Sequence, residues 1–196
     1  MHRTIFSTPV INVLLRTFSI AFLKLNGWKI EGSLPAEHAK YVLIAAPHTS
    51  NWDLPYTLMV AFALRLNIYW MGKSSLFRWP FGSLMRWLGG IEVNREESNN
   101  LVATAAQALV AAEGSVQLIV PPEGTRRKTR YWKTGFYWIA HTAQVPIVLA
   151  YMDYARKLSG LGTVFTPTGD IETDMNKIKA FYAPYKGKNW SQFEHE

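Results

Sequence analysis

Short apolar runs alternate with stretches of helical periodicity along most of the chain. The runs have the length of buried strands, whereas the stretches between them repeat apolar positions every three or four residues. The runs lie near 41–46, 67–71, 90–93, 116–120, 146–152 and 162–166, and the helical patterns near 53–66, 79–88, 99–112, 135–143 and 172–185. This alternation predicts an α/β fold, a single layered domain with a mixed, largely parallel sheet flanked by helices.

The first 28 residues hold the most membrane-like pattern of the chain. Thr8 and Pro9 favour a helix start, and the helix is predicted to run to about Leu25. It carries a polar stripe of Asn12, Arg16 and Ser19, and a broad apolar side of Val10, Val13, Leu14, Phe18, Phe22 and Leu25. Because Arg16 interrupts the apolar run, the run falls well short of the ~20 residues that span a bilayer.

Two interpretations of this N-terminal helix stay open. The length and the apolar side favour a helix that lies in the membrane interface, but the same pattern is typical of an amphipathic helix packed on the protein's own core. The interruption at Arg16 and the lack of an Ala-x-Ala-like site argue against a cleaved signal peptide.

Charge and aromatic content narrow the class of partner. The net charge is +7, from 21 Lys and Arg against 14 Asp and Glu, which favours an anionic partner. Nucleic acid and an anionic bilayer both fit, but the eight tryptophans favour the bilayer because tryptophan prefers the interface between headgroups and acyl chains. Basic and aromatic residues also alternate in 73–88, a second candidate surface. We therefore expect a membrane surface as partner, and no nucleic acid.

An acid/base pair follows the first buried run. His48 and Asp53 lie five positions apart, just after the run that ends near Ala45. A carboxylate that holds one ring nitrogen of a histidine makes the other nitrogen a general base. On a regular helix five positions correspond to about 140° of rotation, so the two side chains meet only if a turn breaks before the helix. Taken alone, the pair is more often a loop histidine and a capping aspartate.

A second polar cluster follows the run 116–120. Glu123, Gly124 and Arg126 stand in the sequence Pro121-Pro-Glu-Gly-Thr-Arg. Gly124 lets the backbone approach a ligand, and the planar guanidinium of Arg126 suits phosphate. The strand near 90–93 is followed by Arg95, another candidate phosphate ligand. Since ligands bind outside the carboxyl ends of strands in open α/β sheets, these clusters are predicted to converge.

Taken in order, His48 to Asp53, Gly90 to Arg95, Pro122 to Arg126 and Val145 to Val148 resemble the four sequence blocks of the glycerolipid and lysophospholipid acyltransferases, the PlsC-like enzymes. The resemblance spans about residues 41 to 150. Together with the helical pattern ahead of it, it predicts an N-terminal amphipathic helix within 1–28 and an acyltransferase domain over 29–196. Two positions depart from the family pattern: Asn94 replaces the usual aspartate, and Pro121 replaces the usual phenylalanine.

The resemblance implies a role for each candidate residue. His48 deprotonates the acceptor hydroxyl and Asp53 orients it, while Glu123 and Gly124 belong to the catalytic and acceptor-binding block. Arg95 and Arg126 match the positions that hold the acceptor's phosphate, and Thr125 adds a hydrogen bond. Direct attack of the acceptor on the thioester is simpler than an acyl-enzyme, because the chain has no cysteine and Ser50 is expected to be structural.

We therefore expect a peripheral O-acyltransferase on the cytoplasmic face of the inner (plasma) membrane. It is predicted to move a fatty acyl chain from acyl-CoA or acyl-carrier protein to a glycerol-phosphate or lysophospholipid acceptor. The sequence has neither a nucleotide motif nor a metal-type His, Asp or Glu spacing, so no cofactor is expected. Three alternatives stay open: a phosphate-free acceptor such as a lyso-aminolipid or glycolipid, a thioesterase in which His48 activates water, and a non-catalytic basic protein that binds membranes or nucleic acid.

Overall fold

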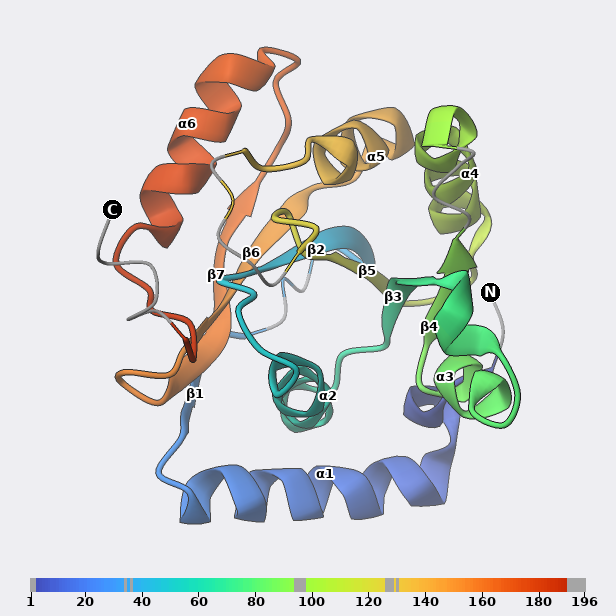
Figure 1. Cartoon of the computed structure of the whole chain (residues 1–196), viewed down its shortest axis with the longest axis vertical. Coiled ribbons are helices and arrows are strands. Elements are labelled where there is room, and N and C mark those ends of the chain that lie inside the picture. Colours follow the sequence, from blue (N-terminus) through green and yellow to red (C-terminus); the bar gives the residue numbers. More distant parts are fainter. Residues whose placement is uncertain are drawn as a thin grey trace.

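The computed structural model describes residues 3–33, 35, 37–93, 98–125, 129 and 131–189. Within these residues a seven-stranded sheet has helices on both faces (Figure 1), and the predicted α/β fold is confirmed. The strands are β1 (Lys29–Glu31), β2 (Lys40–Ala46), β3 (Ile68–Lys73), β4 (Gly90–Val93), β5 (Val116–Val120), β6 (Ile147–Asp153) and β7 (Leu158–Phe165). Their order is β1-β7-β6-β2-β5-β3-β4. Only the pairing of β6 with β7 is antiparallel among these strands, so the sheet is mixed and largely parallel as expected.

Alternating side chains of the central strand β2 face two different cores. Val42 and Ile44 pack in the core on the side of α4, α5 and α6, whereas Tyr41 and Leu43 pack with residues of η1 and α2. This alternation is the two-residue period of a strand that is buried on both faces. The helices are η1 (Ile5–Ser7), α1 (Pro9–Leu25), α2 (Asp53–Leu64), η2 (Ser74–Phe77), α3 (Gly82–Trp87), α4 (Ser98–Ala111), α5 (Gly135–Ala143) and α6 (Ile171–Tyr182).

The helix predicted over 79–88 is shorter in the structure. It begins only at Gly82 and follows the separate 3-10 turn η2. Trp79 stands before Pro80, and a proline disfavours the helical conformation of the residue that precedes it, so the helix begins only after Pro80. The strand β1 was not predicted, since three residues are too few to show a period. The helix α1 has the predicted bounds, but the Thr8 hydroxyl donates to the carbonyl of Thr4 instead of capping α1.

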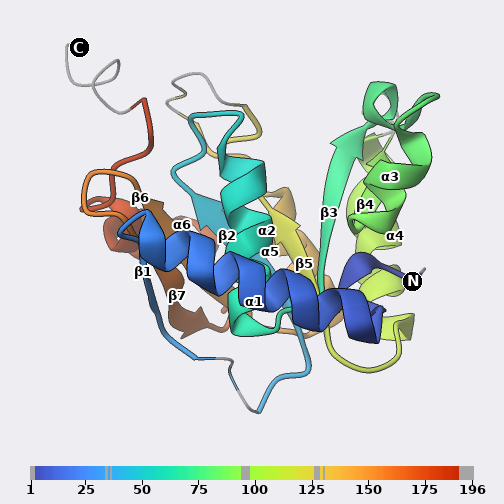
Figure 2. The ribbon, with the colours of Figure 1, turned by 90° about the horizontal axis from the view of Figure 1, so that it is seen from below.

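The N-terminal helix α1 crosses the outer side of α2, so that α2 lies between it and the sheet (Figure 2). Its polar stripe faces the protein. Ser19 is 1% exposed, and Asn12 donates to the carbonyl of Phe6. The Nε of Arg16 is buried and has no hydrogen-bond partner within the described residues. No helix in the described part of the chain combines the length and the apolar character that crossing a bilayer requires.

Candidate active site

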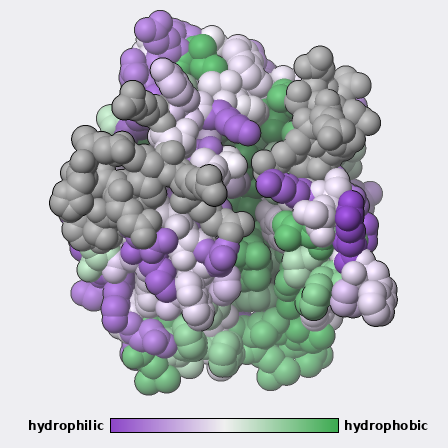
Figure 3. Space-filling model, viewed as in Figure 1, coloured by the Kyte–Doolittle hydropathy of each residue, from purple (hydrophilic) through white to green (hydrophobic). Residues whose placement is uncertain are grey.

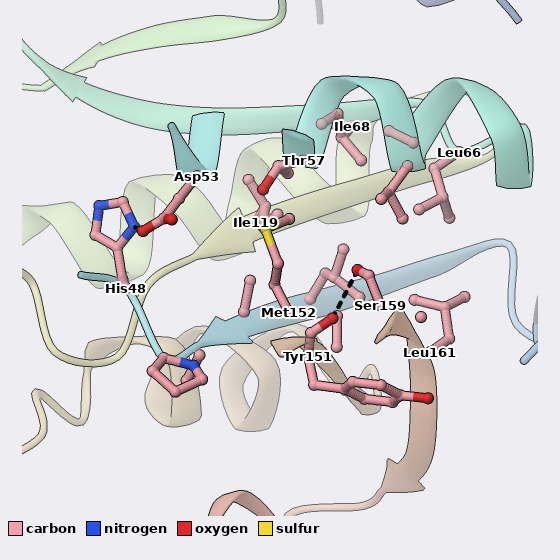
Figure 4. A pocket seen from close by; sticks show the side chains of 18 residues that line it. His48, Asp53, Thr57, Leu66, Ile68, Ile119, Tyr151, Met152, Ser159 and Leu161 are labelled. Atoms are coloured by element: carbon pink, nitrogen blue, oxygen red, sulfur yellow. Dashed lines mark hydrogen bonds and ion pairs between the residues drawn. The ribbon is translucent and has the colours of Figure 1, made fainter. Parts of the chain in front are cut away.

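The turn between β2 and α2 brings the predicted acid/base pair together. His48 follows the carboxyl end of β2, and Asp53 is the first residue of α2, so the chain between them is not helical. The Nδ1 atom of His48 lies 3.0 Å from Oδ2 of Asp53. The other ring nitrogen, Nε2, is on the side of the ring away from Asp53 (Figure 4). The prediction that a turn lets Asp53 reach back to the imidazole is confirmed.

The carboxylate of Asp53 is buried and surrounded by hydrogen-bond donors. Its Oδ2 atom also accepts from the backbone N–H groups of Thr49 and Ser50, at 2.8 and 2.9 Å. Its Oδ1 atom accepts from the hydroxyl of Tyr154 at 2.8 Å. Burial alone raises the pKa of Asp53, but the hydrogen bonds from His48, Ser50 and Tyr154 outweigh it and lower the pKa below its ordinary value. Asp53 is therefore held as an anion that orients the imidazole.

Glu123 reaches the same turn from the neighbouring strand. It follows β5, which pairs in parallel with β2, and its Oε2 atom accepts the backbone N–H of His48 at 2.8 Å. Burial raises the pKa of Glu123 to about 7, and the hydrogen bond from His48 opposes this rise. The predicted convergence of the clusters after β2 and β5 is thus confirmed for His48, Asp53 and Glu123.

The first three backbone N–H groups of the turn all donate hydrogen bonds within the protein. The N–H groups of His48, Thr49 and Ser50 all donate to carboxylates of Glu123 or Asp53. The hydroxyl oxygen of Ser50 accepts from the N–H of Trp52, which fits its expected structural role. These hydrogen bonds fix the turn, and the three backbone N–H groups are not available to an oxyanion.

Of the other predicted site residues, the structure describes two and leaves two outside the described residues. Gly124 adopts a φ of 63°, a backbone conformation that favours glycine, and it lies next to the side chain of Lys133. Thr125 is exposed in the same turn. The two predicted phosphate ligands, Arg95 and Arg126, lie outside the described residues.

A narrow apolar cavity opens beside the pair and follows the inner side of α2 (Figure 4). Its volume is about 510 Å³ including the open mouth. His48 and Asp53 lie at one end, and Leu66 and Ile68 lie beyond the far end of α2. The remaining lining is Leu43, Ala45, Ala46, Pro47, Thr57, Val60, Ala61, Ile119, Ala150, Tyr151, Met152, Ser159, Gly160 and Leu161. The hydroxyl of Ser159 donates to the carbonyl of Tyr151, so it does not make the cavity polar.

Comparisons with known proteins identify the family and a similar fold. A family model described as Acyltransferase matches residues 28–153, more than half of the chain. A similar solved structure is that of the 1-acyl-sn-glycerophosphate (LPA) acyltransferase PlsC from Thermotoga maritima, with a TM-score of 0.59 and 18% sequence identity. The match covers 87% of this chain and 76% of that one, and it shows a shared fold. No match was found among curated protein sequences.

Proposed function

The chain belongs to the Acyltransferase family, and from this premise we propose an O-acyltransferase that moves a fatty acyl chain from acyl-CoA or acyl-carrier protein to a hydroxyl of a glycerol-phosphate or lysophospholipid acceptor. One observation carries the proposal: the His48–Asp53 pair stands at the mouth of a narrow apolar cavity. A general base beside an apolar slot is the arrangement that acylation of a hydroxyl by a long-chain thioester requires.

In the proposed reaction Nε2 of His48 takes the proton of the acceptor hydroxyl as its oxygen attacks the thioester carbonyl. The new C–O bond forms, the C–S bond breaks, and the proton passes from the imidazolium to the thiolate that leaves. Asp53 stabilises the imidazolium through Nδ1, because its carboxylate is already held as an anion by Thr49, Ser50 and Tyr154. Glu123 holds the backbone of His48 in place during these steps.

The acyl chain is assigned to the cavity under α2. The lining residues Thr57, Val60 and Ala61 repeat at helical spacing, so one face of α2 forms a long wall of the slot. The part of α2 that lines the slot runs from Asp53 to Ala61, a rise of about 12 Å, so the slot is elongated along the helix. The thioester carbonyl then lies at the polar end, beside His48.

The acceptor's phosphate is assigned to the basic residues that follow β4 and β5. Arg95 and Arg126 match the family's phosphate-binding positions, and the side chain of Lys133 lies next to Gly124, which precedes Arg126 by two positions in the sequence. The likeness in fold to a protein described as a 1-acyl-sn-glycerophosphate acyltransferase supports an acceptor of this class. A cation beside the attacking hydroxyl orients a phosphate-bearing acceptor for reaction.

Peripheral membrane binding through α1 is part of the proposal. The outer side of α1 exposes Val10, Val13, Leu14, Phe18 and Leu25, while its polar stripe faces α2 and the core. Hydrophobic residues gather along the edge of the molecule that α1 forms (Figure 3). A helix with an exposed apolar face and a basic residue in its last turn, Lys24, is suited to bind a bilayer with an anionic surface. A donor thioester from the cytoplasm would place this surface on the cytoplasmic face of the inner membrane.

The function is tested with purified protein and a radiolabelled long-chain acyl-CoA or acyl-carrier protein. The acceptor panel contains glycerol phosphate, a lysophospholipid and a lyso-aminolipid, each with wild type and His48→Ala. We expect a new acylated phospholipid that the variant does not form. Acyl release without an acceptor, also lost in the variant, would mean that the protein is a thioesterase. Acylation of the lyso-aminolipid alone would mean that the acceptor carries no phosphate.

The assignment of the acyl chain is tested with Ala61→Leu. Ala61 is buried and lines the cavity, so the larger side chain is expected to shorten the slot and shift the preference toward shorter acyl chains. Ala103→Leu, on the exposed side of α4, is the matched control. Equal chain-length profiles for Ala61→Leu and wild type would contradict the assignment.

Membrane binding is tested by vesicle flotation with and without anionic lipid. The double variant Leu14→Ser, Phe18→Ser is expected to stay in solution under conditions in which wild type floats. Val164→Ser changes an exposed apolar residue of β7 and serves as the control. Flotation of the double variant like wild type would remove α1 from the membrane contact.

A further inference from the structure

Two segments outside the family match contact residues 48–53, the turn that carries His48 and Asp53 and is called the catalytic turn below. The match ends at Asp153, and the next residue, Tyr154, donates its hydroxyl to Asp53. The segment Pro184–Asn189, which follows α6, also packs on the turn. Both contacts join residues that are more than a hundred positions apart in the chain. Both lie after the residues that the family model matches; Tyr154 contacts Asp53, and Asn189 contacts Thr49 in the turn before it.

Tyr154 occupies the side of Asp53 that the turn leaves open. His48, Thr49 and Ser50 all contact Oδ2, whereas Tyr154 donates to Oδ1 at 2.8 Å. A carboxylate bonded through one oxygen can still rotate about its Cβ–Cγ bond, and a donor on the second oxygen stops that rotation. Tyr154 therefore fixes the plane in which Oδ2 meets the imidazole.

The ring of Tyr154 is itself held firmly. It meets the ring of Trp28 edge to face, with centroids 5.2 Å apart, and the ring of Tyr56 at 5.8 Å. Its backbone N–H donates to the carbonyl of Lys186 at 2.9 Å. Burial and then the charge of Asp53 raise the pKa of Tyr154, so the phenol stays protonated and can only donate to this carboxylate.

The segment Pro184–Asn189 holds the backbone between His48 and Asp53. Asn189 donates its side-chain amide to the carbonyl of Thr49 at 2.9 Å and its backbone N–H to the Thr49 hydroxyl at 3.3 Å. A Cβ atom on Gly187 would lie 2.5 Å from Oγ1 of Thr49, so the segment passes directly over the turn. The ammonium of Lys188 lies 4.7 Å from the ring centroid of Trp52.

We propose that Tyr154 is a positioning residue of the acyl transfer, which orients Asp53 toward His48, and that Asn189 supports the same turn from the C-terminal segment. This inference rests on the proposed function. Tyr154 does not line the cavity, so it acts on the reaction through Asp53 and not through the acyl chain. When the imidazole takes the acceptor's proton, a fixed Oδ2 stabilises the imidazolium without first having to reorient.

The test compares Tyr154→Phe with Tyr56→Phe. Each change removes one phenol oxygen from the same ring cluster, but Tyr56 is not among the hydrogen-bond partners of Asp53. Tyr154→Phe is expected to lower kcat about ten-fold with KM unchanged, since it loses a bond to a charged group. Tyr56→Phe is expected to keep the wild-type kcat. Because Tyr154→Phe also loses a buried hydrogen bond, kcat is measured well below the melting temperature of each variant, where all of them are folded. Asn189→Ala is expected to lower kcat in the same direction by a smaller factor.

A double substitution separates positioning from a general structural effect. In the Asp53→Asn background, measured over long incubations, Tyr154→Phe is expected to change the remaining rate less than two-fold, because its target is already altered. A full ten-fold loss in that background, or wild-type kcat for Tyr154→Phe alone, would overturn the proposal.

An NMR titration of the Asp53 carboxyl carbon measures the effect of the hydrogen bond from Tyr154 on the pKa of Asp53 and needs no activity assay. Removing the Tyr154 hydroxyl is expected to raise the pKa of Asp53 toward its ordinary value. An unchanged titration would overturn the positioning role. Failure of the proposed function has a different signature, since wild type would then form no acylated product that His48→Ala abolishes, whatever the titration shows.

Discussion

The catalytic turn and the outer side of α1 differ in which side chains are buried: polar ones are buried in the turn, and apolar ones are exposed on α1. In the turn, polar groups are buried and paired: Asp53 is 5% exposed and contacts four donors. On α1 the large apolar side chains face outward, with Leu25 at 86% exposed, while Ser19 is enclosed. Buried polar groups that are fully paired make a rigid site, whereas an outward apolar face has a free-energy gain still available on contact with an apolar partner.

The contrast shows which region is complete in the isolated protein. The hydrogen bonds of Asp53 and Glu123 are present without substrate, so the turn is preorganised for proton transfer. The apolar side chains of α1 each stand to gain about 1.5–3 kcal/mol on full burial, and nothing in the described protein covers them. We infer that the first region determines the chemistry and the second determines where it takes place.

Asp53→Ala removes the acceptor of the buried hydrogen bonds in the catalytic turn and has the largest expected effect. It leaves the buried N–H groups of Thr49 and Ser50 and the Tyr154 hydroxyl without their acceptor, which is expected to lower the free energy of unfolding by about 2–4 kcal/mol. The acylation rate is expected to fall about 100- to 10,000-fold, since the general base loses its partner.

Urea unfolding and the acyl-transfer assay measure the two effects of this change. Asp170→Ala removes an exposed carboxylate that caps α6 and is the control. An Asp53→Ala protein with the stability of the Asp170 variant and a wild-type rate would show that the pairing is unimportant.

Leu23→Ala and Leu25→Ala sharpen the comparison on a single helix. Leu23 is 1% exposed, and its truncation is expected to cost about 2–5 kcal/mol of stability through the cavity that it leaves. Leu25→Ala is expected to change stability by less than about 0.5 kcal/mol but to weaken vesicle binding. Thermal unfolding without lipid, followed by vesicle flotation, separates the two outcomes. Equal losses of stability for both variants would mean that the outer side of α1 is covered by the protein.

Glu123→Gln has a smaller expected effect than Asp53→Ala, and this effect depends on pH. The unfolded carboxyl titrates near ~4.3, whereas burial raises the pKa of folded Glu123 to about 7, so between these values the folded state binds more protons and wild-type stability falls as pH rises. Glutamine cannot titrate and still offers an oxygen to the His48 N–H. The variant is therefore expected to gain on the order of 2 kcal/mol relative to wild type from pH 4.5 to pH 7.

Denaturant unfolding across this pH range measures the gain. Glu172→Gln, in the exposed first turn of α6, controls for the loss of a carboxylate as such. A difference between Glu123→Gln and wild type that does not change with pH would contradict the raised pKa.

Local patterns were sufficient to predict the sheet and the core of the site. Each long apolar run became a strand, and the rule that ligand sites lie at the carboxyl ends of parallel strands placed Glu123 near His48 before any coordinates were known. The turn between His48 and Asp53 followed from the angle that a helix would impose on them. Arg95 and Arg126 stay predictions, since they lie outside the described residues.

Other features depend on contacts that no local pattern contains. Tyr154 and Asn189 come after β6 and α6, and only the assembled sheet and helices bring them to Asp53 and Thr49. The period of α1 indicated two sides but not which one faces the protein, because an amphipathic pattern is the same for both directions. The short strand β1 was missed because its pairing with β7, not its composition, makes it a strand.

The central claim is tested most directly by the appearance of product in one mixture. Purified protein, vesicles that contain a lysophospholipid and an isotopically labelled acyl-CoA or acyl-carrier protein are incubated, and the lipids are analysed by mass spectrometry. The account predicts labelled diacyl phospholipid with wild type and none with His48→Ala at equal fold stability. Equal product from both proteins, or no labelled lipid from wild type with either donor, would contradict it.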